Sequence, residues 1–175
     1  MTVLVVGGAA SGKSAWAEEM LCKLSGDAPR VYLATMQPFG TEAAARIERH
    51  RSMRAGRGFR TIECYVNLSF ADVPPGSAVL LEDVGNLVAN ELFDPTGSGD
   101  AAADTVVRGV EVLRERCRVL VIVSNEVLSG GTAYAGDTLR WMRALGEVNI
   151  RLAALSDRVC ELVCGIAVVH REGVC

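Results

Sequence analysis

Gly7-Gly8-Ala9-Ala10-Ser11-Gly12-Lys13-Ser14 is the stretch of sequence that decides the fold. It matches the pattern G-x-x-x-x-G-K-[S/T], in which a glycine-rich turn leads directly into a helix. The apolar, β-branched run Thr2–Val6 precedes it, as expected of a buried strand, and a helical pattern from Lys13 to about Leu24 follows. This order of strand, loop and helix predicts a loop that binds the phosphates of a purine nucleoside triphosphate.

Each residue type in the loop has a physical role. The small residues let the backbone curl so that successive N–H groups point at phosphate oxygens. Lys13 can reach the β- and γ-phosphates, Ser14 can offer its hydroxyl to Mg²⁺, and the helix adds its positive N-terminal end. The loop does not identify the reaction, since GTPases, ATPases and small-molecule kinases share it. The sequence has no Asn-Lys-x-Asp guanine motif, which disfavours a switch-type GTPase.

Short apolar runs alternate with longer helical patterns along the rest of the chain. The further predicted strands are Arg30–Thr35, Arg60–Cys64, Ala78–Glu82, Arg118–Ser124 and a final strand or hairpin over Cys160–His170. The further predicted helices are Thr41–Arg57, Val84–Phe93, one that ends near Cys117, and Asp137–Ala154, with a surface loop over Asp94–Asp104. This alternation predicts a single α/β domain over residues 1–175, with a mainly parallel sheet and helices on both faces.

The composition narrows the class of protein. The chain has 175 residues, of which half are hydrophobic, a net charge of −3 and 22% charged residues, and this argues against a disordered tail or a general nucleic-acid binder. No segment resembles a membrane span or a signal peptide. The six cysteines form no Cys-x-x-Cys pair and there are only two histidines, so a zinc site is not expected. We interpret the cysteines as reduced, small core residues of a cytoplasmic protein.

Two adjacent carboxylates end one of the predicted buried strands. The run Val79-Leu80-Leu81 leads into Glu82 and Asp83. Ligands of open α/β sheets bind at the carboxyl ends of the strands, so a carboxylate here can hold Mg²⁺ or accept a proton from a phosphoryl acceptor. The alternative is a solvated acidic turn. The sequence does not choose between Glu82 and Asp83.

A histidine lies among arginines on the predicted helix Thr41–Arg57. Residues four apart share a helix face, so Arg46, His50 and Arg54 are expected to line up. Such a cationic face suits a triphosphate, and the guanidinium groups favour a neutral imidazole that can attack phosphorus and form a phosphoramidate. The alternative is a solvated basic helix with an incidental histidine.

Together these features resemble the bifunctional adenosylcobinamide kinase / adenosylcobinamide-phosphate guanylyltransferase family of cobalamin assembly. The blocks that carry the resemblance run along nearly the whole chain: residues 7–14 with Ala17-Glu18, Tyr32–Thr35, Arg46-Ile47 with His50-Arg51 and Arg54, Thr61 with Glu63, Leu80–Glu82, Val123–Val127, Gly146 with Asn149, Leu152-Ala153 and Gly165-Ile166. The chain departs from the family's usual pattern at Ala10, where arginine is common, at Asp83, where cysteine is common, and over Leu128–Ala133.

The resemblance implies a RecA-like fold, a homo-oligomer that is a trimer, and a set of site residues. Gly7–Ser14 would hold the triphosphate, with Mg²⁺ on Ser14, and His50 would become guanylylated. The remaining nucleotide-binding residues that the resemblance implies are Ala34, Thr35, Met36, Arg51, Ser52, Met53, Arg54, Glu63 and Glu82. Lys13 and Glu82 would serve catalysis with His50.

The resemblance also implies two reactions. ATP or GTP would phosphorylate the aminopropanol hydroxyl of adenosylcobinamide. GTP would then give GMP to His50, and adenosylcobinamide phosphate would take it up to form adenosylcobinamide-GDP. The rival hypotheses are another phosphate-loop small-molecule kinase without a covalent intermediate, and a non-enzymatic nucleotide-binding sensor. Trp16 and Trp141 are expected to be packing residues. Asn125 and Glu126 end the predicted central strand, at the sheet edge where ligands bind, and no role is assigned to them.

Overall fold

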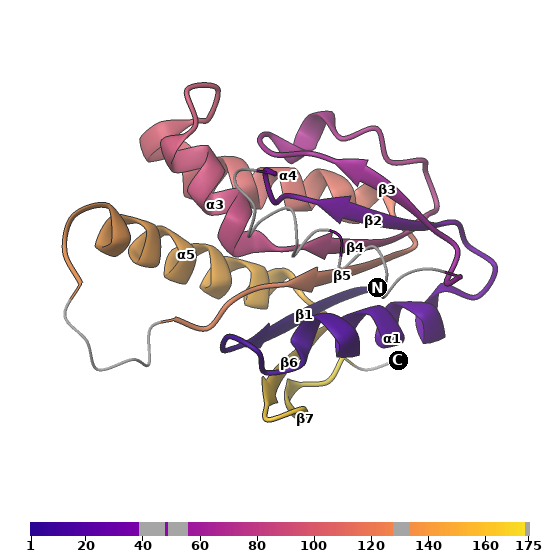
Figure 1. The fold of residues 1–175 in the computed structure, drawn as a ribbon. Coiled ribbons are helices and arrows are strands. Elements are labelled where there is room, and N and C mark those ends of the chain that lie inside the picture. The colour runs from indigo at the N-terminus through magenta and orange to yellow at the C-terminus, as the bar shows by residue number, and fades with distance from the viewer. Residues whose placement is uncertain (39–47, 49–55, 128–133, 174–175) are drawn as a thin grey trace.

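The computed structural model describes residues 1–38, 48, 56–127 and 134–173, and its strands form one seven-stranded sheet (Figure 1). The strand order across the sheet is β3-β2-β4-β5-β1-β6-β7. Every pairing is parallel except that of β6 with β7. The strands are β1 (Thr2–Gly7), β2 (Arg30–Ala34), β3 (Phe59–Glu63), β4 (Ala78–Glu82), β5 (Val119–Val123), β6 (Arg158–Val163) and β7 (Ile166–Arg171).

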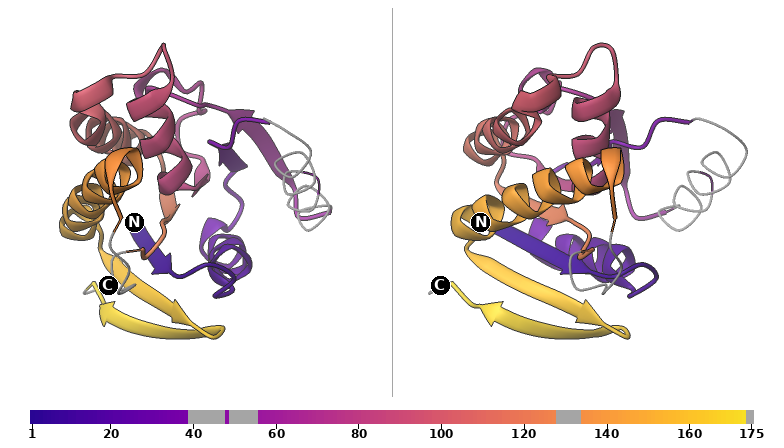
Figure 2. Two further views of the ribbon diagram at one scale, coloured as in Figure 1. Left: turned by 60° about the vertical axis from the view of Figure 1, so that its left-hand side comes forward. Right: turned by 90° about the vertical axis from the view of Figure 1, so that its left-hand side faces the viewer.

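Helices cover both faces of the sheet (Figures 1 and 2). One face packs against α1 (Lys13–Ser25), and the other packs against α3 (Val84–Phe93), α4 (Ala102–Arg116) and α5 (Gly136–Leu155). Successive side chains of a strand point to opposite faces, so Leu120 and Ile122 of β5 join the α3–α5 side while Val121 joins the α1 side. Burial on both faces explains why the central strands are continuous apolar runs rather than alternating ones.

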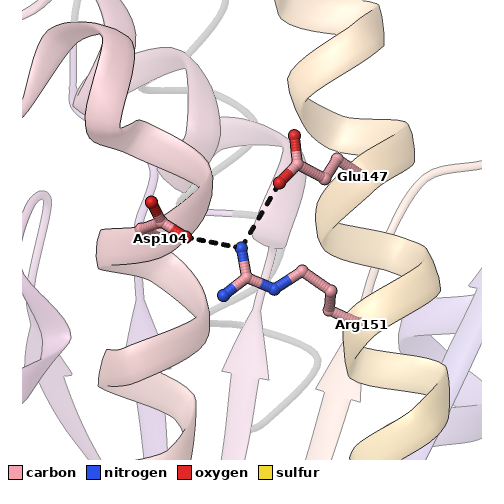
Figure 3. Close-up of polar contacts among 3 residues, drawn as sticks. All are labelled: Asp104, Glu147 and Arg151. Carbon is pink, nitrogen blue, oxygen red and sulfur yellow. Dashed lines mark hydrogen bonds and ion pairs between the residues drawn. The ribbon is translucent and has the colours of Figure 1, made fainter.

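The last two helices are tied together at the surface (Figure 3). Arg151 of α5 donates to Asp104 of α4 at 2.7 Å and to Glu147 on its own helix at 3.3 Å. Exposed ion pairs of this kind contribute at most about 1 kcal/mol each. The orientation of α5 therefore depends mainly on its buried face, where Leu145, Val148 and Leu152 join the core.

The predicted α/β architecture, with a parallel sheet and helices on both faces, is confirmed, and most predicted ends shift by one or two residues. The predicted final segment is the hairpin β6–β7. The predicted loop Asp94–Asp104 is too long, because a 3₁₀ turn at Gly99–Ala101 leads into α4 at Ala102, which is buried in the core. Apart from Glu48 and the turn that begins at Gly56, the predicted helix Thr41–Arg57 lies outside the described residues.

The cysteine interpretation is only partly correct. All five described cysteines are free thiols, but only Cys160 is buried and Cys164 is exposed in the β6–β7 turn. No helix in the described part of the chain is long and apolar enough to cross a bilayer.

The parallel arrangement gathers the strand ends at one edge of the sheet. The register places Ala34, the last residue of β2, beside Glu63 of β3 and beside Glu82 of β4. In Figure 1 these carboxyl ends point towards the side of the molecule where α3 and α5 lie. The loop that follows β1 opens at the same edge, so residues from distant parts of the chain meet there.

Candidate functional site

The predicted phosphate loop occupies the turn between β1 and α1. Gly12 precedes the helix with a φ of +88°, a left-handed conformation that favours glycine, and α1 begins at Lys13. The Lys13 side chain is only 7% exposed, and its Nζ donates to the carbonyl of Gly8 at 3.0 Å. The lysine thus lies folded along the loop, at the positive end of α1, where an anion is stabilised.

Three segments from the other half of the chain hold the loop in place. The amide of Gly165, in the β6–β7 turn, donates to the carbonyl of Ser11 at 2.9 Å. The amide of Glu126, which follows β5, donates to the carbonyl of Gly7 at 3.0 Å. Gly7 also packs tightly on β6, since a Cβ there would lie 2.8 Å from the carbonyl oxygen of Leu162. Sequence reasoning missed this bracing by the C-terminal hairpin.

Replacing Gly7 with alanine is expected to destabilise the fold by about 1–3 kcal/mol, because the new methyl group overpacks a rigid site. Its Cβ would lie 2.7 Å from the Ser11 hydroxyl and 2.8 Å from the Leu162 carbonyl oxygen. Gly8→Ala is the matched control: nothing lies within 4 Å of its Cβ, so its free energy of unfolding should change by less than about 0.5 kcal/mol. Urea unfolding of the two variants measures this, and equal losses would contradict the steric account.

Glu82, the last residue of β4, contacts Ser14 at the end of the phosphate loop. The Ser14 hydroxyl donates to its Oε1 at 2.5 Å, and Glu82 as a whole is 6% exposed. Its Oε2 is buried and has no hydrogen-bond partner among the described residues. A serine hydroxyl and a carboxylate with an uncommitted oxygen are hard oxygen ligands, the type that Mg²⁺ prefers. These two residues therefore fit the magnesium ion that accompanies a nucleoside triphosphate.

The surroundings of Glu82 raise the pKa of its carboxyl group from 4.5 to about 7. Burial is the main cause, since it disfavours the charged form, and the neighbouring carboxylate of Asp83 adds to it. The Ser14 hydrogen bond and the Lys13 ammonium act in the opposite direction. Without a cation, Glu82 is therefore about half protonated at pH 7.

This pKa predicts a pH dependence of stability in metal-free protein. The folded protein retains the Glu82 proton up to about pH 7, whereas the unfolded chain loses it near pH 4.5. The folded state binds more protons in that window, so its stability falls as the pH rises from 5 to 8, by on the order of 3 kcal/mol. Glu82→Gln stays neutral and should lack this loss. Urea unfolding in EDTA at both pH values measures the difference, and equal pH slopes for the two proteins would contradict it.

Asp83 has a different role from Glu82. Its Oδ1 accepts from the amide of Asn86 at 2.7 Å and its Oδ2 from the side chain of Asn86 at 3.0 Å, so it is the N-cap of α3. The sequence did not distinguish the positions of the two acids. In the structure, Glu82 contacts Ser14, and Asp83 caps the next helix.

The other predicted nucleotide contacts lie at the ends of β2 and β3. Thr35 is fully buried, and its hydroxyl contacts the carbonyls of Glu82 and Asp83 at 3.0 and 2.7 Å, which holds the chain where β4 ends. Ala34 and Met36 are half-buried, and the exposed Glu63 accepts from the Tyr65 hydroxyl at 2.8 Å. Their contact with a nucleotide stays a prediction, as do the roles of His50 and Arg51–Arg54, which lie outside the described residues.

A cavity of about 670 Å³ opens beside the loop. Residues 9–15 line one part of it. The rest is lined by Asp83, Gly85, Asn86 and Ala89 at α3, by Asn125 and Val127 after β5, and by Trp141 of α5. The indole of Trp141 packs against the core, as predicted, but its Nε1 also donates to the Gly85 carbonyl at 2.9 Å and the ring lines the cavity. Sequence reasoning missed Asn86 and Ala89, because no local pattern reveals a helix face that borders a distant loop.

The backbone of Asn125 is held by Asn149 of α5. The Ser124 hydroxyl donates to Asn149 Oδ1 at 2.6 Å, and Asn149 Nδ2 donates to the Asn125 carbonyl at 3.1 Å. The two hydrogen bonds fix the backbone where β5 ends. Asn125 therefore lies beside the phosphate loop, as expected of a residue at the end of the central strand.

Sequence comparisons with known proteins point to the same family in each case. The family model described as cobinamide kinase / cobinamide phosphate guanyltransferase matches residues 3–169. Two relatives bear the name bifunctional adenosylcobalamin biosynthesis protein CobU. The one from Salmonella typhimurium is 38% identical and the one from Escherichia coli is 37% identical, and each alignment covers 96% of this chain and 98% of the relative.

A solved structure supports the fold. The ATPase domain of G40P superimposes with a TM-score of 0.52 at 12% sequence identity, over 91% of this chain and 68% of that chain. An identity this low bears on the fold alone. With the phosphate loop and the parallel strands, it confirms the predicted RecA-like α/β architecture.

Proposed function

Since the chain belongs to the cobinamide kinase / cobinamide phosphate guanyltransferase family, we propose that its single phosphate loop serves both a phosphoryl transfer and a guanylyl transfer. The protein is a bifunctional transferase of cobalamin biosynthesis. The observation that carries the assignment of residues is the pairing of Ser14 with Glu82, beside the buried Lys13, at the mouth of the loop.

In the kinase reaction, the loop amides and Lys13 hold the β- and γ-phosphates of ATP or GTP. The aminopropanol hydroxyl oxygen of adenosylcobinamide attacks the γ-phosphorus, the bond to the β–γ bridging oxygen breaks, and the nucleoside diphosphate leaves. The hydroxyl proton passes to water. Ser14 and Glu82 would hold Mg²⁺, which neutralises charge that develops on the phosphate oxygens.

In the transferase reaction, an imidazole nitrogen of His50 attacks the α-phosphorus of GTP. The bond to the α–β bridging oxygen breaks, pyrophosphate leaves, and GMP remains on His50 through a P–N bond. A phosphate oxygen of adenosylcobinamide phosphate then attacks the same phosphorus and breaks the P–N bond. Adenosylcobinamide-GDP forms and His50 is regenerated. Ala34, Thr35, Met36, Arg51, Ser52, Met53, Arg54 and Glu63 are proposed to surround the nucleotide.

Two mass measurements on the unmodified protein test this function. Incubation with cobinamide and Mg-ATP or Mg-GTP should yield cobinamide phosphate. Incubation with Mg-GTP alone, followed by denaturation, should add one GMP to the intact mass, in a linkage that survives base but not acid. Phosphorylation without an adduct would instead indicate a small-molecule kinase with no covalent intermediate. The absence of both activities would indicate a nucleotide-binding sensor.

We further propose that residues 1–175 act as one catalytic domain of a cytoplasmic homo-oligomer, a trimer as the resemblance implies. The β6–β7 hairpin offers apolar surface for such an assembly, since Val163, Ile166, Val168 and Val169 are all more than 40% exposed. Light scattering after size exclusion measures the oligomeric state. A monomer at micromolar concentration would contradict the trimer.

A further inference from the structure

The cavity beside the phosphate loop has two chemically different parts. The loop supplies amides and Lys13, which is the only cation among the described lining residues. The second part contains the Asp83 carboxylate, which caps α3, and an uncharged surface, here called the neutral wall, formed by Gly85, Asn86, Ala89, Asn125, Val127 and Trp141. It offers amide groups, alkyl groups and an indole. Phosphates need cations and N–H donors, so they belong at the loop, whereas the neutral wall suits an uncharged organic group.

The neutral wall lies next to the carboxyl end of β4, where Glu82 contacts Ser14. Asp83 lines the cavity and directly follows Glu82, whose carboxylate contacts the Ser14 hydroxyl. Ser14 and Glu82 would hold the Mg²⁺ that accompanies the triphosphate, which would bring the transferable phosphate near this end of β4. The cavity therefore begins where the transferable phosphate is proposed to lie, and residues of α3 and α5 line the rest of it.

The neutral wall is built as a rigid surface. The Trp141 indole donates to the Gly85 carbonyl at 2.9 Å, and Asn149 holds the backbone of Asn125 at 3.1 Å. Gly85 makes the close approach feasible: a Cβ there would lie 2.5 Å from Asn125 Nδ2 and 3.5 Å from the Trp141 ring. A pre-organised wall of amides and an aromatic ring binds a ligand without first losing conformational entropy.

We propose that the neutral wall is the acceptor pocket of the kinase step. It takes the amide-linked, hydroxyl-terminated arm of cobinamide and directs the hydroxyl oxygen at the γ-phosphate. Asn125 and Asn86 hydrogen-bond to the arm, and Trp141 packs on its alkyl carbons. The cavity of about 670 Å³ includes the loop as well as the neutral wall, so we place only the arm inside it and the corrinoid ring at its mouth. This inference rests on the proposed kinase function.

Ala89→Met tests the pocket by filling it. Ala89 is half-buried on α3 and lines the cavity, and methionine is a good helix former, so the fold should tolerate the change. The KM for cobinamide should rise about tenfold or more, which corresponds to losing one good contact. The KM for ATP and the rate of GMP adduct formation should change less than about twofold. Ala154→Met, at an exposed position of α5, is the matched control and should leave all three values unchanged.

Asn125→Ala is a second variant, chosen because it removes bulk and amide groups rather than adding volume. It should lower kcat/KM for cobinamide about tenfold, since a half-buried hydrogen-bonding partner is lost. Thermal unfolding of both variants checks that the fold persists.

The outcomes separate the possible occupants. If either variant raises the KM for ATP and slows adduct formation while the KM for cobinamide holds, the nucleoside occupies the neutral wall and the proposal is wrong. If neither variant changes any constant, the wall binds no substrate and the proposal is likewise wrong. Failure of the underlying function differs from both, because the wild-type protein would then phosphorylate no cobinamide at all.

Discussion

Lys13→Ala should reduce kcat/KM for both reactions by about a thousandfold, because removal of one pre-organised group at a phosphate costs on this order. Both the γ-phosphate transfer and the α-phosphate attack start from a triphosphate held by the same loop. Lys13 is 7% exposed and lies along the loop, with its Nζ 3.0 Å from the Gly8 carbonyl. In such a partly desolvated position, a cation stabilises phosphate charge far more than it does in water.

Lys23→Ala is the matched control for this variant. Lys23 lies on the same helix, but its side chain is 69% exposed and pairs with Glu19 one turn earlier, at 2.7 Å. An exposed pair of this kind contributes less than about 1 kcal/mol, so the variant should keep both activities. Calorimetric titration with a non-hydrolysable triphosphate measures the binding directly. Unchanged affinity in Lys13→Ala would show that the loop does not hold the triphosphate as proposed.

His50→Gln should abolish the GMP adduct and guanylyl transfer while phosphorylation of cobinamide stays within about threefold of wild type, a change below 1 kcal/mol. Glutamine keeps a polar side chain of similar reach but has no nucleophilic nitrogen, so no P–N bond can form. The γ-phosphate transfer does not use the imidazole. The two reactions should therefore separate in this one variant, whereas Lys13→Ala loses them together.

His170→Gln is the control, because His170 is the other histidine of the chain. It is exposed on β7 and contacts Glu161 at 2.9 Å. It should form the adduct as wild type does, and the modified peptide after proteolysis should contain His50. An adduct on a peptide with His170, or one that persists in His50→Gln, would refute the assigned nucleophile.

Much of the fold followed from the sequence because its signals are local. The phosphate loop is eight contiguous residues, and the apolar runs of β1, β4 and β5 identify strands that are buried on both faces. Helix propensity and helix caps depend on residues within one or two helical turns of each other in the sequence. Element boundaries depend on packing as well. The helix α4 begins earlier than expected because Ala102 packs in the core, although the residues before it are polar and rich in glycine.

The arrangement of the site required long-range pairing that no local pattern encodes. Ser14 and Glu82 are 68 positions apart, yet their oxygens lie 2.5 Å from each other. The reversal of side-chain direction from one residue to the next explains why Glu82, and not Asp83, contacts Ser14. The resemblance assigns Thr35 to the nucleotide, but in this structure its hydroxyl contacts the backbone carbonyls of Glu82 and Asp83.

The sequence by itself determined that this protein binds a triphosphate, because the loop Gly7–Ser14 carries its amides, its lysine and its helix start in one uninterrupted stretch. It also determined the alternation of strands and helices, since periodicity and β-branching are properties of neighbours in the chain. Only the tertiary structure decided which carboxylate meets Ser14, how the C-terminal hairpin braces the loop, and that Trp141 and Asn125 border one cavity. Those relations arise where packing brings distant segments together, and their geometry depends on every element between them.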